Sequence, residues 1–156
     1  MTTAKDFADG VKRMAAEREA RRVVRMVDGK ALVAAARANG GFTVSLTGAP
    51  DPVDGIGVSL PGNEERGSLD LSDERLGQWV ERYATVHEAA LTAMRGNRYL
   101  GGWVEDGRLV LDVTGVFEDL SVALILARQW GQRSVYNFET REVIEVPAER
   151  VESSIE

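Results

Sequence analysis

The clearest alternation of apolar and polar positions lies between residues 99 and 114, on both sides of Asp106-Gly107. This dipeptide suits a two-residue type I′ turn, because both central residues of that turn need positive φ. A hairpin closed by the turn pairs residues whose numbers sum to 213. One face of the hairpin then carries only apolar residues and glycine: Leu100, Gly102, Val104, Leu109, Leu111 and Val113. The opposite face is mixed, which predicts a sheet packed on one side.

Four further strands are predicted from short apolar runs. Residues 42–47 and 56–60 alternate apolar with polar side chains, so each should be a half-buried strand. Residues 134–138 and 143–146 form a second predicted hairpin around a polar turn. The remaining stretches between residues 42 and 72 are rich in turn residues, and we expect loops there: 48–55 and 61–67.

Apolar residues at three- and four-residue steps predict four helices, over residues 4–27, 30–38, 72–94 and 119–130. Ser72 and Asp119 are suitable N-caps for the last two. The last helix should bury Leu120, Ala123, Leu124, Ala127 and Trp130. Ile125 and Leu126 widen this apolar face, so the helix is either deeply buried or partly at an interface.

Together these elements predict a single α+β domain in the order α-α-β-β-α-β-β-α-β-β, with a mainly antiparallel sheet of β-hairpins packed against helices. We expect three regions along the chain. Residues 1–40 form a basic N-terminal helical arm or lid, residues 41–148 the α+β body, and residues 149–156 a flexible acidic tail.

Composition excludes several classes of site. The 156 residues include no cysteine and one histidine, so disulfides, thiolate nucleophiles and the usual multi-histidine metal centres are excluded. No cofactor is expected. No segment approaches the ~20 apolar residues of a membrane span, and we expect a soluble protein located in the host cytoplasm or in a virion.

The net charge of −6 is unevenly distributed. Residues 1–41 hold nine Lys and Arg against five Asp and Glu, a net charge of +4, and the remaining ten basic and twenty acidic residues give −10. The acidic body is therefore a poor nucleic-acid binder. A cluster of arginines on the first helix is either a contact for phosphate or an acidic partner, or a solvated face: Arg18, Arg21, Arg22 and Arg25.

Two positions invite a chemical interpretation. His87 lies on or beside an apolar helical stripe, and a packed histidine explains it better than catalysis. On the mixed face of the hairpin, Asp112 opposes Gly101, with Tyr99 and Trp103 one step to either side of the glycine. An acid between two aromatic rings could bind a cationic or hydroxyl-bearing group. Alternatively, the rings fill the space left by glycine and Asp112 bonds locally.

Three stretches resemble a known family: 41–45, 57–62 and above all 99–113. Similar sequences occur in small proteins of actinobacterial phages and prophages, and in a module fused to larger phage head-associated polyvalent proteins. The segment 126–144 fits the end of that module, where similar proteins carry Asn-Gln-x-Ala-Ile-Phe-Asp, although Ser134 and Tyr136-Asn137 depart from this pattern. The resemblance covers roughly residues 41–146 and implies no established activity or site residues.

These observations lead to a non-enzymatic phage or prophage protein that acts by protein–protein binding, as a minor head or virion-associated component. Its partner would be a phage structural protein or a second copy, with the basic helix docking and the acidic body as scaffold. An alternative is an acidic inhibitor that mimics nucleic-acid charge to block a host defence enzyme. A small enzyme using Asp112 with Tyr99 is a third hypothesis, but the sequence offers no nucleophile–base pair.

Overall fold

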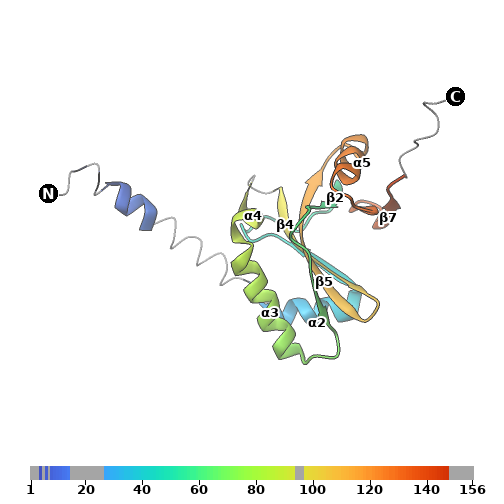
Figure 1. Ribbon diagram of the computed structural model, residues 1–156, viewed down its shortest axis with the longest axis horizontal. Coiled ribbons are helices and arrows are strands. Elements are labelled where there is room, and N and C mark those ends of the chain that lie inside the picture. Colours follow the sequence, from blue (N-terminus) through green and yellow to red (C-terminus); the bar gives the residue numbers. More distant parts are fainter. Residues whose placement is uncertain (1–3, 5, 7, 15–26, 94–96, 148–156) are drawn as a thin grey trace.

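The computed structural model (Figure 1) describes residues 4, 6, 8–14, 27–93 and 97–147, and it confirms an α+β fold. The strands are β1 Gly41–Val44, β2 Ile56–Ser59, β3 Glu65–Ser68, β4 Arg98–Glu105, β5 Arg108–Phe117, β6 Ser134–Asn137 and β7 Glu142–Glu145. The labelled helices are α2 Gly29–Asn39, α3 Asp73–Val86, α4 Glu88–Thr92 and α5 Leu120–Gln129. Residues 8–14 are also helical. The strands form one antiparallel sheet in the order β1-β4-β5-β2-β6-β7, with β3 also paired to β5.

The central hairpin has the predicted register. Every pair from Arg98 and Gly115 to Glu105 and Arg108 sums to 213. The turn residues Asp106 and Gly107 have φ of 50° and 74°, as a type I′ turn requires. Strand β5 therefore extends through the centre of the sheet, with β4 along one edge and both β3 and β2 along the other.

The helices pack on one face of the sheet. Helices α2, α3 and α4 cover a core that includes four hairpin residues, Leu100, Leu109, Leu111 and Val113. Helix α5 covers a smaller core that contains Ile56 and Val58 of β2. Val58 lies opposite Gly115, so it shares a face with Val113 and both cores lie on the same side. Figure 1 shows α2, α3 and α4 together beside the sheet, with α5 at the far end of β5.

Helix ends follow the local sequence. Asp28, Ser72 and Asp119 are the N-caps of α2, α3 and α5, and each side chain accepts a backbone hydrogen bond from the first turn. Gly40 ends α2 in the left-handed conformation with φ of 86°. The predicted tail, residues 149–156, lies outside the described residues, as does part of the predicted arm, but α2, which belongs to that arm, contributes Val33 and Ala36 to the larger core.

Three segments differ from the predictions. The strand predicted over 42–47 ends at Val44, the last residue of β1. The stretch 61–67 was expected to be a loop, but Glu65–Ser68 forms β3, because β5 offers a free edge that pairs with it. The helix predicted over 72–94 is broken at His87, whose φ and ψ of −100° and 17° end α3 before α4 begins. The apolar repeat continues across this break, so the sequence pattern could not reveal it.

The mixed face of the hairpin is more buried than a sheet packed on one side predicts. Val110, Asp112, Thr114 and Tyr99 are all buried on this face, although the four labelled helices pack on the other. Val104, which was expected on the packed face, is exposed near the hairpin turn. The centre of the sheet is therefore buried on both faces, and the polar groups there need internal partners.

Candidate functional site

Asp112 lies at the centre of β5, directly opposite Gly101 of β4, as the register predicted. Its side chain is only 1% exposed. A Cβ atom on Gly101 would lie 2.2 Å from the Asp112 Oδ1 atom, so the carboxylate occupies the space that this glycine leaves open. A side chain at position 101 would displace the carboxylate.

Two hydroxyl groups bind the Asp112 carboxylate. The Thr114 Oγ1 atom donates to Asp112 Oδ1 at 2.8 Å. The Ser59 hydroxyl, from β2, donates to Asp112 Oδ2. Both carboxylate oxygens thus have a partner inside the protein, which offsets part of the cost of burying them.

The pKa of Asp112 is raised to about 6. Burial is the largest cause, because the charged form loses its hydration, while the hydrogen bonds from Ser59 and Thr114 act in the opposite direction. The nearby charge of Glu64 raises the pKa further. The carboxyl group is therefore easier to protonate than an exposed aspartate.

Tyr99 and Trp103 lie on the same face as Asp112, as predicted. Tyr99 opposes Thr114 and is 7% exposed, whereas Trp103 opposes Val110 and is half-buried. The structure thus brings the three residues together around Gly101. A cation from solvent could not reach Asp112 while the carboxylate is buried. This arrangement favours local bonding, and the binding-site interpretation remains a hypothesis.

The arginine cluster on the first helix, at positions 18, 21, 22 and 25, lies outside the described residues.

His87 joins the α3–α4 break to the β2–β3 connection and β3. Its Nδ1 atom lies 3.1 Å from Asn63 Oδ1, and its Nε2 atom lies 3.2 Å from Glu65 Oε2. Asn63 Nδ2 donates to the Pro61 carbonyl at 3.0 Å, which leaves Oδ1 directed at the histidine. The imidazole ring also packs on Tyr83, with 4.1 Å between ring centroids. His87 is therefore a packed histidine that links two elements.

Replacing His87 with alanine should destabilise the fold. The variant loses the ring contact with Tyr83 and the imidazole N–H donor that faces Asn63 Oδ1 or Glu65 Oε2, and we expect a loss of about 1–3 kcal/mol in the free energy of unfolding. His87→Gln, which keeps one amide donor, should lose less. Urea unfolding followed by circular dichroism measures the free energy of unfolding of the wild type and of both variants. An alanine variant as stable as the wild type would contradict a linking role for this residue.

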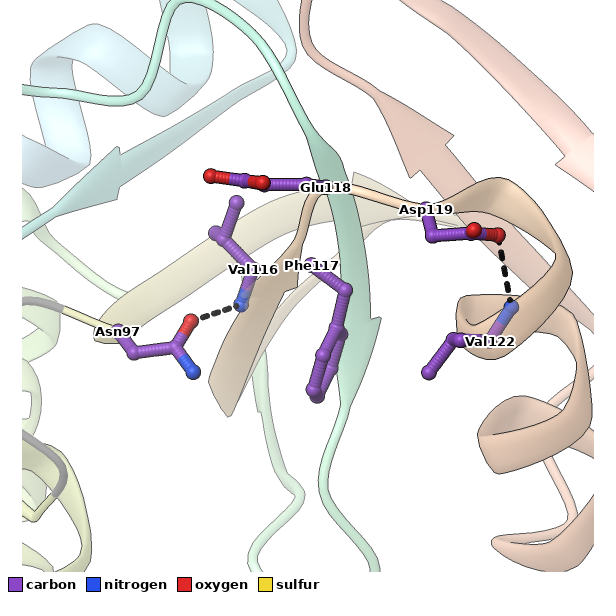
Figure 2. A pocket seen from close by; sticks show the side chains of 6 residues that line it. All are labelled: Asn97, Val116, Phe117, Glu118, Asp119 and Val122. Carbon is purple, nitrogen blue, oxygen red and sulfur yellow. Dashed lines mark hydrogen bonds between the residues drawn. The ribbon is translucent and has the colours of Figure 1, made fainter.

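A surface depression of about 400 Å³ lies where β5 joins α5. It is lined by Asn97, Val116, Phe117, Glu118, Asp119 and Val122. In Figure 2, the Phe117 ring lies between Asn97 and Val122, and the Glu118 and Asp119 carboxylates point in opposite directions. Asp119 caps α5 by accepting from Ser121 N at 2.7 Å and Val122 N at 3.2 Å, whereas Glu118 forms no ion pair within the described residues. The depression thus has an apolar wall and an acidic rim.

The outer side of α5 continues this apolar wall. Val122 is 46% exposed and Ile125 is 55% exposed. Leu126, one turn after Val122, is half-buried beside them. We call this surface the α5 patch and define it by four residues: Phe117, Val122, Ile125 and Leu126. Of the two alternatives for this helix, the exposed side chains favour an interface.

One predicted burial on α5 is wrong. Leu120 was expected inside but is 41% exposed. It is the first residue of the helix, and side chains of a helix tilt toward its N-terminus, so Leu120 extends beyond the part of α5 that covers the sheet. Ala123 and Ala127 are buried as predicted, and Leu124 and Trp130 pack against the smaller core.

Within the described part of the chain, no three His, Asp or Glu side chains gather where they could hold a metal ion. None of its helices is long and apolar enough to cross a membrane. No protein-family model, no curated protein and no solved structure matches this chain.

Proposed function

We propose that this chain is a non-enzymatic protein of an actinobacterial phage or prophage that acts by binding a protein, as a minor component of the head or virion. The α5 patch is the observation that carries the binding function. It exposes Val122 and Ile125 beside a depression whose wall is apolar. Contiguous apolar surface of this kind favours a protein partner, since covering it gains about 25 cal/mol per Å². The assignment to phages rests on the sequence resemblance of residues 41–146.

The surroundings of Asp112 and His87 support a binding protein over an enzyme. Asp112 is bound by two hydroxyl groups and is closed to solvent. His87 contacts Asn63, Glu65 and Tyr83, and none of these is a serine or threonine that it could activate as a base. Neither group is placed to act on a substrate.

The acidic-inhibitor alternative has less support from the surface of α3. Charge mimicry needs carboxylates without interleaved cations, but Asp73 and Glu74 are followed at once by Arg75. Asp73 also pairs with Arg37 of α2, with 2.8 Å between the Asp73 Oδ1 and Arg37 Nε atoms. A mixed surface of this kind is typical of a solvated helix.

Mass spectrometry of purified particles of the source phage tests the proposal. Peptides of this chain should be present in the particles at low copy number. In phages that carry Ile125→Asp, the chain should be lost from particles while it remains in the lysate. Val143→Asp is the matched control, because Val143 of β7 is 67% exposed and lies outside the α5 patch. Absence of the wild-type chain from particles, despite its presence in the lysate, would overturn the proposal.

A further inference from the structure

We infer that the α5 patch binds a second copy of this chain, with the two α5 helices packed antiparallel about a two-fold axis. The inference rests on the proposed function, because it identifies the partner of the same patch. A two-fold interface uses one surface twice, so that surface must be complementary to itself in both shape and charge.

The shape of the α5 patch meets this requirement. The depression lies at the N-terminal end of α5, and Ile125, the most exposed side chain of the patch, lies one turn after Val122. When two such helices run antiparallel with Val122 of each beside Ile125 of the other, the C-terminal half of each helix lies over the depression of its partner. Each copy then places Ile125 against Val122 of the other, at the edge of the depression that Val122 lines.

The charges along α5 select the antiparallel direction. Glu118 and Asp119 lie at the N-terminal end of the helix, and Arg128 lies in its last turn. An antiparallel partner brings the acidic end of each helix beside Arg128 of the other copy, whereas a parallel partner brings like charges together. Antiparallel helix dipoles also attract each other.

Glu118 and Arg128, at the two ends of α5, can each form an ion pair across this contact. Glu118 has no ion-pair partner within the described residues. The Arg128 Nη2 atom donates to the Pro147 carbonyl at 3.3 Å, and an arginine has five N–H donors, so others remain for an acidic neighbour. The antiparallel pair would therefore form Glu118–Arg128 contacts twice.

The size of the patch sets the strength of the dimer. A contact made by two ten-residue helices and the adjoining depression buries a few hundred Å² per chain, below the roughly 800 Å² per partner of a standard interface. We therefore expect a reversible dimer in the micromolar range. Several copies bound to one particle would raise the effective concentration and strengthen the contact.

Sedimentation velocity of the full chain, from about 5 to 500 µM, tests the inference. The mass should rise with concentration from 17.0 kDa toward twice that value. Ile125→Asp should weaken the dimer at least tenfold, since each substitution acts twice in a two-fold interface. Val143→Asp should leave it unchanged. Circular dichroism on both variants separates lost association from lost folding.

Charge exchange tests the direction of packing. Arg128→Glu and Glu118→Arg should each weaken the dimer, and the double variant should restore it, because its contacts are reversed but still opposite in sign. A 17.0 kDa species over the whole concentration range, or a dimer insensitive to Ile125→Asp, would overturn the inference. If the chain is present in particles but is monomeric in solution, only the inference is overturned, and the proposed function is still supported.

Discussion

Replacing Gly29 with alanine should lower the free energy of unfolding by about 3 kcal/mol or more, although only one methyl group is added. Gly29 is the first residue of α2 and is buried against α3. A Cβ atom at this position would lie 2.0 Å from the backbone carbonyl oxygen of Gly77 and 2.7 Å from its carbonyl carbon. Backbone atoms of a packed helix cannot rotate away, so the two helices must separate and loosen the core between them.

Gly77, on the α3 side of this contact, allows a second substitution that tests the same close approach. A Cβ atom on Gly77 would lie 2.8 Å from the backbone nitrogen of Lys30, so Gly77→Ala should be similarly destabilising. The double variant should lose less than the two single losses combined, because one separation of α2 and α3 relieves both clashes.

Gly10→Ala is the matched substitution outside this contact, since nothing lies within 4 Å of a Cβ atom there, and it should change stability by less than ~1 kcal/mol. Thermal unfolding measures all four variants; 3 kcal/mol corresponds to roughly 6–12 °C in a chain of this size. Wild-type stability in Gly29→Ala would contradict the close approach of α2 and α3.

Local signals explain which parts of the fold could be predicted. The hairpin register follows from Asp106-Gly107 and from alternation within a few residues, so β4 and β5 were placed correctly. Strand β3 has no apolar alternation, and it forms because the edge of β5 is free to pair with it. Gly29 falls in the gap between the helices predicted over 4–27 and 30–38, and no local pattern indicates that Gly77, 48 positions later, lies against it.

The candidate site, too, could be predicted only where its contacts lie within one hairpin. The position of Asp112 over Gly101 follows from the hairpin register alone. The alternation of residues 56–60 predicts only that Ser59 is a polar residue on the outer face of its strand. Its contact with Asp112, 53 residues later, depends on the pairing of β2 with β5. Burial on the mixed face likewise depends on the whole sheet. The electrostatics of Asp112 could therefore be obtained only from the structure.

Those electrostatics predict that Asp112→Asn is more stable than the wild type at pH 7.5, by about 2–3 kcal/mol. The folded protein raises the pKa of Asp112 from 3.8 to about 6, so folding disfavours the ionised form. Below pH 3.8 the carboxyl is protonated in both states and has no effect. As the pH rises from about 4 to 6, Asp112 ionises more readily in the unfolded chain than in the folded protein, so the free energy of unfolding falls. Above about pH 6 this fall is complete. Asparagine removes this loss, and its amide can both accept from one hydroxyl group and donate to the other.

Urea unfolding of Asp112→Asn and wild type at pH values between about 4 and 7.5 measures the difference, which should grow with pH and nearly vanish at the acidic end. Taking the difference between the two proteins cancels the titration of all other groups. Thr114→Val is the complementary variant: it removes a hydrogen bond that lowers the pKa of Asp112, so stability should fall more steeply with pH than in the wild type. An asparagine variant that is less stable at pH 7.5 would mean that the ionised carboxylate is itself stabilised. That result would favour the cation-binding interpretation of Tyr99, Trp103 and Asp112 over local bonding.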